Sequence, residues 1–289
     1  GQRCAELADP KAAQAFYTEE LILLPGDKPW EYYEPRTNNG TSKLANGADF
    51  GSFTRERLSR AVLAHDEEAA ALLRDPGSVL YFCAQATFKF HIAFDKTLSE
   101  IQRLDPKAVI VLIELQDELS RIHTKIKQRL EENSGVDLKR VVFVPRMSHQ
   151  YLMGMYQNAD VVLDSLYFGG DTTSREAFET GAPIITLPHK TIGQRWTQAY
   201  YKMMGIEDFI ARDTNHYARL AVEVANRSPE AKTQLRERIK RSAQEKLFRK
   251  TDGAQYWAEM FLDVATRPRR WRWDHEKLQE PQKSGREEL

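Results

Sequence analysis

The sequence contains few cysteines, no long apolar run and no excess of charge of either sign. Cys4 and Cys83 are the two cysteines among 289 residues, and two cysteines cannot build a disulfide framework. We therefore expect a reducing compartment, cytoplasmic or nucleocytoplasmic. No apolar stretch approaches the roughly 20 residues that a membrane helix needs, and the start has no signal-peptide core. Lys and Arg together number 42, as do Asp and Glu. This balance argues against a general polyanion binder, and we expect neither nucleic acid nor a membrane as a partner.

The motifs of several common enzyme classes are also absent. The turn after the first predicted strand, 83–88, has no glycine, so the dinucleotide-binding fingerprint is missing. The chain has no GxxxxGK[ST] phosphate loop and no GxSxG nucleophile turn. Its seven histidines show no metal-ligand spacing. We therefore predict neither a bound metal nor a resident cofactor.

The central part of the chain alternates between apolar runs and helical patterns. Strands are predicted at 79–83, 109–113, 141–144, 161–163 and 184–187, with helices between them at about 92–103, 117–132, 148–158 and 172–180. Strands this continuously apolar are covered on both faces, which predicts an α/β fold: a Rossmann-like parallel sheet with helices on both faces. Further helices are predicted at 194–204, 214–226, 230–246 and 253–265.

Three parts are expected along the chain. Residues 1–74 form an N-terminal segment, with a helical pattern at 55–73 after a stretch rich in Pro, Gly, Asn and aromatics. Residues 75–266 form the sheet domain and its C-terminal helices, and 267–289 form a charged, solvated tail. The aromatic residues near the end are expected to pack a terminal helix rather than to stack on bases; they are Trp257, Phe261, Trp271 and Trp273.

The segment 161–187 is the most informative. After a strand, Gly169 and Gly170 form a loop whose backbone N–H groups would face a ligand at the start of a helix, which suits phosphate. Asp171, Thr172 and Thr173 are expected to supply capping side chains, and Gly181 is placed where a left-handed helix stop belongs. Glu176 lies one turn further on, where its carboxylate could accept hydrogen bonds from ribose hydroxyls.

Polar and basic residues follow the strands at what would be a single edge of the sheet. Ligands of open parallel sheets bind beyond the carboxyl ends of the strands, so this clustering predicts one site for an anionic ligand. The residues concerned are Gln85, Thr87, Lys89, His91, Glu114, Pro145, Arg146, His149, Tyr167, Gly169, Gly170, Asp171, Thr172, Thr173, His189, Lys190, Gln194 and Arg195.

Each of these features also has a structural interpretation. The glycine loop could belong to an ordinary capped helix, and Lys89 could be a solvated lysine. His149 could be structural, although with Arg146 it makes a small basic pair able to bracket a base edge or a phosphate. Gln194 and Arg195 could be a pair on a helix surface.

Dispersed motifs then resemble a known family. The text QATFKFH at 85–91, and the text at 141–211 that begins VVFVPRMSHQYLMGMYQNADVVLD, are similar to the C-terminal lobe of O-linked N-acetylglucosamine transferases and of their SPINDLY-like relatives. The resemblance covers roughly 75–265 and is weaker at about 15–74, where it includes LILLPGDKPWEYYEP.

The resemblance implies a two-lobed GT-B glycosyltransferase whose C-terminal lobe binds a nucleotide sugar. The donor would be UDP-N-acetylglucosamine, no metal would be needed, and the acceptor would be a Ser or Thr of a protein or peptide. One relative transfers fucose from GDP-fucose instead. The matching positions imply Lys89 on the diphosphate, Gln85 near the sugar phosphate, Arg146 and His149 on the nucleoside, Thr172 and Thr173 on the phosphates, and Glu176 on the ribose. Gly170 and Arg195 complete the expected binding residues.

The sequence departs from the family in two ways. Asp171 replaces a histidine of some relatives, and a carboxylate there would repel a diphosphate unless it turns away to cap the helix. The family's N-terminal catalytic lobe and its tetratricopeptide repeats are not visible, so the chain resembles half of an enzyme, which would need that lobe. Two alternatives stay open: a module that binds a nucleotide without transfer, or an interaction domain whose site has decayed.

Overall fold

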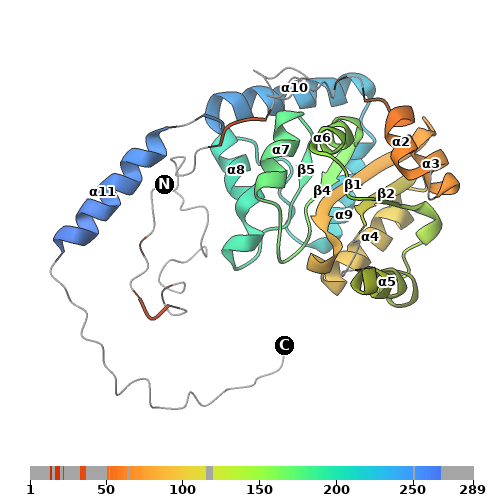
Figure 1. Cartoon of the computed structure of the whole chain (residues 1–289), viewed down its shortest axis with the longest axis horizontal. Helices are drawn as coiled ribbons and strands as arrows, with labels where there is room; N and C mark the ends of the chain where they lie inside the picture. Colours follow the sequence, from red (N-terminus) through yellow and green to blue (C-terminus); the bar gives the residue numbers. More distant parts are fainter. Residues whose placement is uncertain are drawn as a thin grey trace, which may run out of the picture.

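A parallel sheet organises the protein in the computed structural model (Figure 1). The structure describes residues 53–63, 66–114, 120–249 and 251–267, with short pieces at 14, 17–19, 22, 33–36 and 51. Most of residues 1–52 of the N-terminal segment, and all of the tail at 267–289 except its first residue, lie outside the described residues.

The sheet contains the five predicted strands, in the order β3-β2-β1-β4-β5, all parallel. They are β1 (Val79–Ala86), β2 (Ala108–Ile113), β3 (Val141–Val144), β4 (Val161–Leu163) and β5 (Ile184–Ile185). Their side chains are almost all buried, as continuous apolar runs require. The predicted α/β fold is therefore confirmed. The prediction of 184–187 as one strand was too long, because Thr186 only bridges to Ile210.

Helices cover both faces of this sheet (Figure 1). On one face α4 (Ile92–Leu104) packs against α9 (Thr214–Ala225), and on the other α6 (His149–Asn158) packs against α7 (Thr172–Glu179). α8 (Trp196–Met204) and α10 (Pro229–Lys246) follow, and α10 contacts both α7 and α8. Between β2 and β3 lies α5 (Ser120–Gln128), which continues into a π-helical turn at Arg129–Asn133.

The helix predicted at 55–73 is two helices, α2 (Arg55–Leu63) and α3 (Glu67–Arg74). The prediction was wrong because Asp66 starts a new helix: its side chain accepts a hydrogen bond from the amide of Ala69 at 2.8 Å. Glu67 and Glu68 follow in the first turn, where negative charge is favourable.

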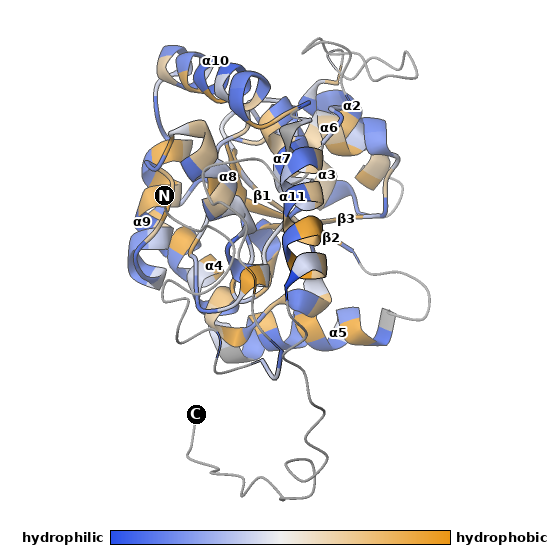
Figure 2. Cartoon of the chain, turned by 90° about the vertical axis from the view of Figure 1, so that its left-hand side faces the viewer, coloured by the Kyte–Doolittle hydropathy of each residue, from blue (hydrophilic) through white to orange (hydrophobic). Residues whose placement is uncertain are grey.

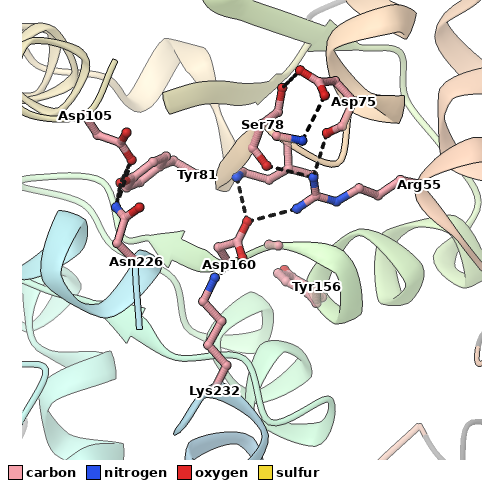
Figure 3. A network of polar contacts seen from close by, with 12 residues as sticks. Arg55, Asp75, Ser78, Tyr81, Asp105, Tyr156, Asp160, Asn226 and Lys232 are labelled. Carbon is pink, nitrogen blue, oxygen red and sulfur yellow. Dashed lines mark hydrogen bonds and ion pairs between the residues drawn. The ribbon is translucent and has the colours of Figure 1, made fainter. Parts of the chain in front are cut away.

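A polar network fastens the amino edge of the sheet (Figure 3). Asp160, just before β4, accepts from the amide of Leu80 at 2.8 Å, from Arg55 at 3.0 Å and from Lys232 at 2.6 Å. One carboxylate thus joins β1, α2 and α10. These contacts lie at the edge of the sheet opposite the carboxyl ends of the strands.

The last described helix, α11 (Asp252–Thr266), extends away from the sheet (Figure 1), and Figure 2 shows that it carries both hydrophobic and hydrophilic residues. Phe261 is 60% exposed and Leu262 is 65% exposed, and Trp257 stacks on Phe261 with ring centroids 5.7 Å apart. The expectation for Phe261 was wrong, since its side chain is exposed rather than packed against the sheet, and Trp271 and Trp273 lie outside the described residues. None of the helices that the structure describes is both long and apolar enough to cross a membrane.

Candidate functional site

The candidate site lies where the strand order changes direction. From β1, the chain adds β2 and β3 on one side of the sheet and then β4 and β5 on the other side. The strand order therefore reverses between β1 and β4, and this is the topological switch point. Open α/β sheets bind ligands in the crevice beyond the carboxyl ends of the strands at such a switch. Gln85 lies at the end of β1, and the glycine loop and α7 follow β4.

A chain of hydrogen-bonded side chains connects β1 to α7 at this switch point. Lys89 donates from Nζ to Gln85 Oε1 at 2.9 Å, and Gln85 donates from Nε2 to Thr173 Oγ1 at 2.6 Å. The structure therefore brings together three residues that the sequence predicts on the phosphates. Their roles on the phosphates stay predictions.

Gly170 is at this point because a side chain would not fit. A Cβ there would approach Ser174 Oγ and Thr173 Oγ1 at 2.6 Å, and Gln85 Nε2 at 2.8 Å. All three atoms belong to side chains around the switch point. Gly170 therefore permits the close approach of β1 and α7.

The amides of the glycine loop are not the expected phosphate donors. Gly170 N donates to Asp164 Oδ1 at 2.7 Å, and Gly169 N donates to the carbonyl of Gly193 at 2.8 Å. Asp164 is buried, also accepts from Thr186 Oγ1 at 2.8 Å, and has its pKa raised by burial. Among the described residues nothing accepts from the amides of Thr172 and Thr173. The available donors are therefore those of the first turn of α7.

Asp171 does not cap α7, contrary to the expectation from the sequence. No side-chain cap hydrogen bond forms at this helix start. Instead the carboxylate accepts from Arg175 Nη2 at 2.7 Å and from the hydroxyl of Tyr200. The expectation missed both partners because an Asp before a helix is usually read as its cap.

The ammonium group of Lys89 interacts with the ring of Phe168 and with the carboxylate of Asp164. Its ammonium lies 4.6 Å from the ring centroid of Phe168, which is 53% exposed. Burial lowers the pKa of Lys89, while attraction to the carboxylate of Asp164 opposes that change. Partial burial strengthens the interaction of this ammonium with any anion that enters.

Two of the predicted nucleoside residues, His149 and Glu176, meet at α7. His149, the first residue of α6, lies with Nε2 2.9 Å from Glu176 Oε1, and the Glu176 side chain is only 6% exposed. Arg36 Nε lies 3.3 Å from the same oxygen. Sequence reasoning missed Arg36, because an irregular segment gave no sign that it reaches α7. Arg146 is exposed between β3 and α6.

Two further predicted residues have contacts within their own helix starts. Arg195 is buried before α8 and donates from Nε to Gln198 Oε1 at 3.2 Å. Gln194 Oε1 accepts from the amide of Thr191 at 3.3 Å as part of a capping box. Thr172 is exposed beside Thr173 at the start of α7.

Comparison with known proteins gives the family. The sequence model of glycosyl transferase family 41 matches residues 53–260, most of the chain. The chain belongs to glycosyl transferase family 41. This family member is 28% identical over 90 residues to the UDP-N-acetylglucosamine–peptide N-acetylglucosaminyltransferase of Caenorhabditis elegans, a match over 31% of this chain and 8% of that protein. It is 27% identical over 97 residues to a probable enzyme of the same name, SPINDLY, from Petunia hybrida, over 33% of this chain and 10% of that protein.

A solved structure has the same fold. A mutant of the Thermobaculum terrenum O-GlcNAc transferase superposes with a TM-score of 0.61 at 20% identity, over 91% of this chain and 43% of that one. The family member thus spans less than half of this solved relative. The expected Rossmann-like sheet of a GT-B glycosyltransferase is thereby confirmed.

Proposed function

We propose that this protein binds UDP-N-acetylglucosamine, or a related nucleotide sugar, with the diphosphate at the start of α7. As part of a complete enzyme it transfers N-acetylglucosamine to a Ser or Thr of an acceptor protein. The observation that carries the proposal is the chain Lys89–Gln85–Thr173 across the switch point of the sheet. Membership of glycosyl transferase family 41 supports the reaction class.

The chemistry requires stabilisation of a leaving diphosphate. The acceptor hydroxyl oxygen bonds to the anomeric carbon, the bond from that carbon to the phosphate oxygen breaks, and UDP leaves with the electron pair. The acceptor proton passes to a base that the described residues do not identify. Lys89 and the first-turn amides of α7 are placed to stabilise the negative charge that grows on the diphosphate.

The nucleoside would lie further along α7. Ribose hydroxyls donate to Glu176, which His149 orients through the 2.9 Å contact. Arg36 shares the same carboxylate oxygen and must move or share it with the ribose. The exposed side chain of Arg146 would contact the base or a phosphate.

Ligand-induced thermal stabilisation tests the proposal. UDP, GDP, UDP-N-acetylglucosamine and GDP-fucose are added separately to the whole chain, and the melting temperature is measured. At a hundredfold excess over Kd we expect UDP to raise the Tm by about 5–10 °C. Lys89→Ala and Glu176→Ala should each abolish the rise.

Lys139→Ala is the matched control, because Lys139 is exposed at the amino edge, before β3. It should leave the rise intact. Absence of any rise at millimolar UDP and GDP would overturn the proposal.

A further inference from the structure

A carboxylate at the position of Asp171 would interfere with the binding of a diphosphate unless other residues held it away. Its carboxylate stands at the start of α7, the helix whose first-turn amides would meet the phosphates. An aspartate at this position usually accepts hydrogen bonds from those same amides, which would block them, and a free carboxylate would repel the ligand. Here it does neither.

The backbone and two side chains direct the carboxylate elsewhere. Asp171 has φ −111° and ψ −85°, outside the extended region that cap residues adopt, and makes no cap hydrogen bond. Arg175 Nη2 donates to Oδ1 at 2.7 Å from one turn along the helix, and the Tyr200 hydroxyl donates to the same atom from α8. The amides of Thr172 and Thr173 are thereby left open, as described above.

Arg175 is itself held in place. Its guanidinium carbon lies 4.7 Å from the ring centroid of Tyr33 and 5.3 Å from that of Tyr200, and its side chain is 8% exposed. Tyr33 in turn donates to Glu179 at 2.5 Å and packs against Phe248. A cation this buried needs a counter-charge, and Asp171 supplies it.

We propose that Arg175 and Tyr200 are positioning residues that hold Asp171 away from the diphosphate and so keep the α7 amides open. They act through Asp171 and touch no reacting atom. The inference rests on the proposed function, since it requires that a nucleoside diphosphate binds here. If the carboxylate of Asp171 were released, it would either accept hydrogen bonds from the α7 amides or stand beside the two phosphates as a third negative group.

A comparison of UDP with uridine tests this inference. Kd values are measured calorimetrically for the whole chain, for Tyr200→Phe and for Arg175→Met. Each variant should raise the Kd of UDP about tenfold, the effect of one released charge, and change that of uridine less than about twofold. Adding Asp171→Asn to Tyr200→Phe should restore the affinity for UDP.

The control and the contrary outcomes are distinct. Arg238→Met breaks an exposed pair between α10 and Asp208, which lies in the turn after α8, and should change neither Kd. Equal weakening of UDP and uridine, or no rescue by Asp171→Asn, would overturn the inference, as would loss of UDP binding in Asp171→Asn alone. If the unaltered chain binds neither UDP nor GDP, the proposed function itself fails; if it binds UDP and Tyr200→Phe binds it equally well, only this inference fails.

Discussion

Single atoms decide how closely β1 and α7 can approach, and Gly170 shows this most clearly. Gly170→Ala places a methyl group among the Ser174, Thr173 and Gln85 side chains, which must move apart. We expect the Kd for UDP to rise at least about tenfold, because the Gln85–Thr173 bond is lost. The cost in stability should be only about 1–3 kcal/mol, since side-chain ends can shift. Calorimetric titration and urea unfolding measure the two effects.

Gly181 provides the contrasting substitution. It has φ +76°, and a Cβ there would collide with the carbonyl oxygen of Arg236. Gly181→Ala should therefore lower stability more than Gly170→Ala, while the protein that stays folded binds UDP normally. The reverse order of the two effects would contradict this account of the glycines.

His123 gives a pH dependence with a defined sign. Burial lowers the pKa of His123 from its ordinary 6.5, Lys127 adds to this, and Glu114 opposes it. The unfolded chain therefore takes up a proton at a higher pH than the folded one, and stability is lost as the pH falls below about 6.5. In urea unfolding from pH 8 to about 5, His123→Leu should lose less stability than the unaltered protein. Parallel curves for the two proteins would show that His123 has no part in the effect.

At the scale of elements, Asp160 joins a strand and two helices through one carboxylate. Asp160→Ala leaves the Leu80 amide, Arg55 and Lys232 without this acceptor. We expect a loss of roughly 2–3 kcal/mol in the free energy of unfolding, read from urea titration. The Kd for UDP should not change, because the network lies at the amino edge of the sheet.

Asp208→Ala is the matched control. Asp208 pairs with Arg238 at 2.9 Å, but both side chains are about half exposed, at 52% and 51%. Its loss should change stability by less than about 1 kcal/mol. Similar costs for the two aspartates would show that burial does not set their value.

Elements differ in how far the sequence predicts them. The five strands could be predicted because each is an apolar run buried on both faces, and Gly181 because a helix stop needs a positive φ. The break before α3 also had a local sign, an aspartate followed by two glutamates. The direction of Asp171 could not be predicted, because it depends on Tyr200 in α8. The same holds for Arg36, whose partner Glu176 is distant in the sequence.

At the scale of the whole molecule, α11 stands apart from the rest. Ending the chain after residue 250 removes α11 and should change the free energy of unfolding by less than about 1 kcal/mol, because its larger apolar side chains are exposed. The UDP-induced rise in Tm should persist.

Ending the chain after residue 246 is the comparison. It also removes Leu247 and Phe248, which are 4% exposed, and the ring contact of Phe248 with Tyr33. This should lower stability by several kcal/mol, about 2–5 for each large buried side chain removed. Equal Tm values for the two truncated chains would refute this assignment of the boundary of the core.

The contact between Tyr33 and Glu179 spans 146 positions of the chain. During synthesis at roughly 5–20 residues per second, Tyr33 waits about 7–30 s before its partner is made. The carbonyl of Tyr33 also accepts from the amide of Arg249, which is made later still. Residues 33–36 therefore complete these two contacts only after both Glu179 and Arg249 have been made, when the five strands of the sheet have already been synthesised.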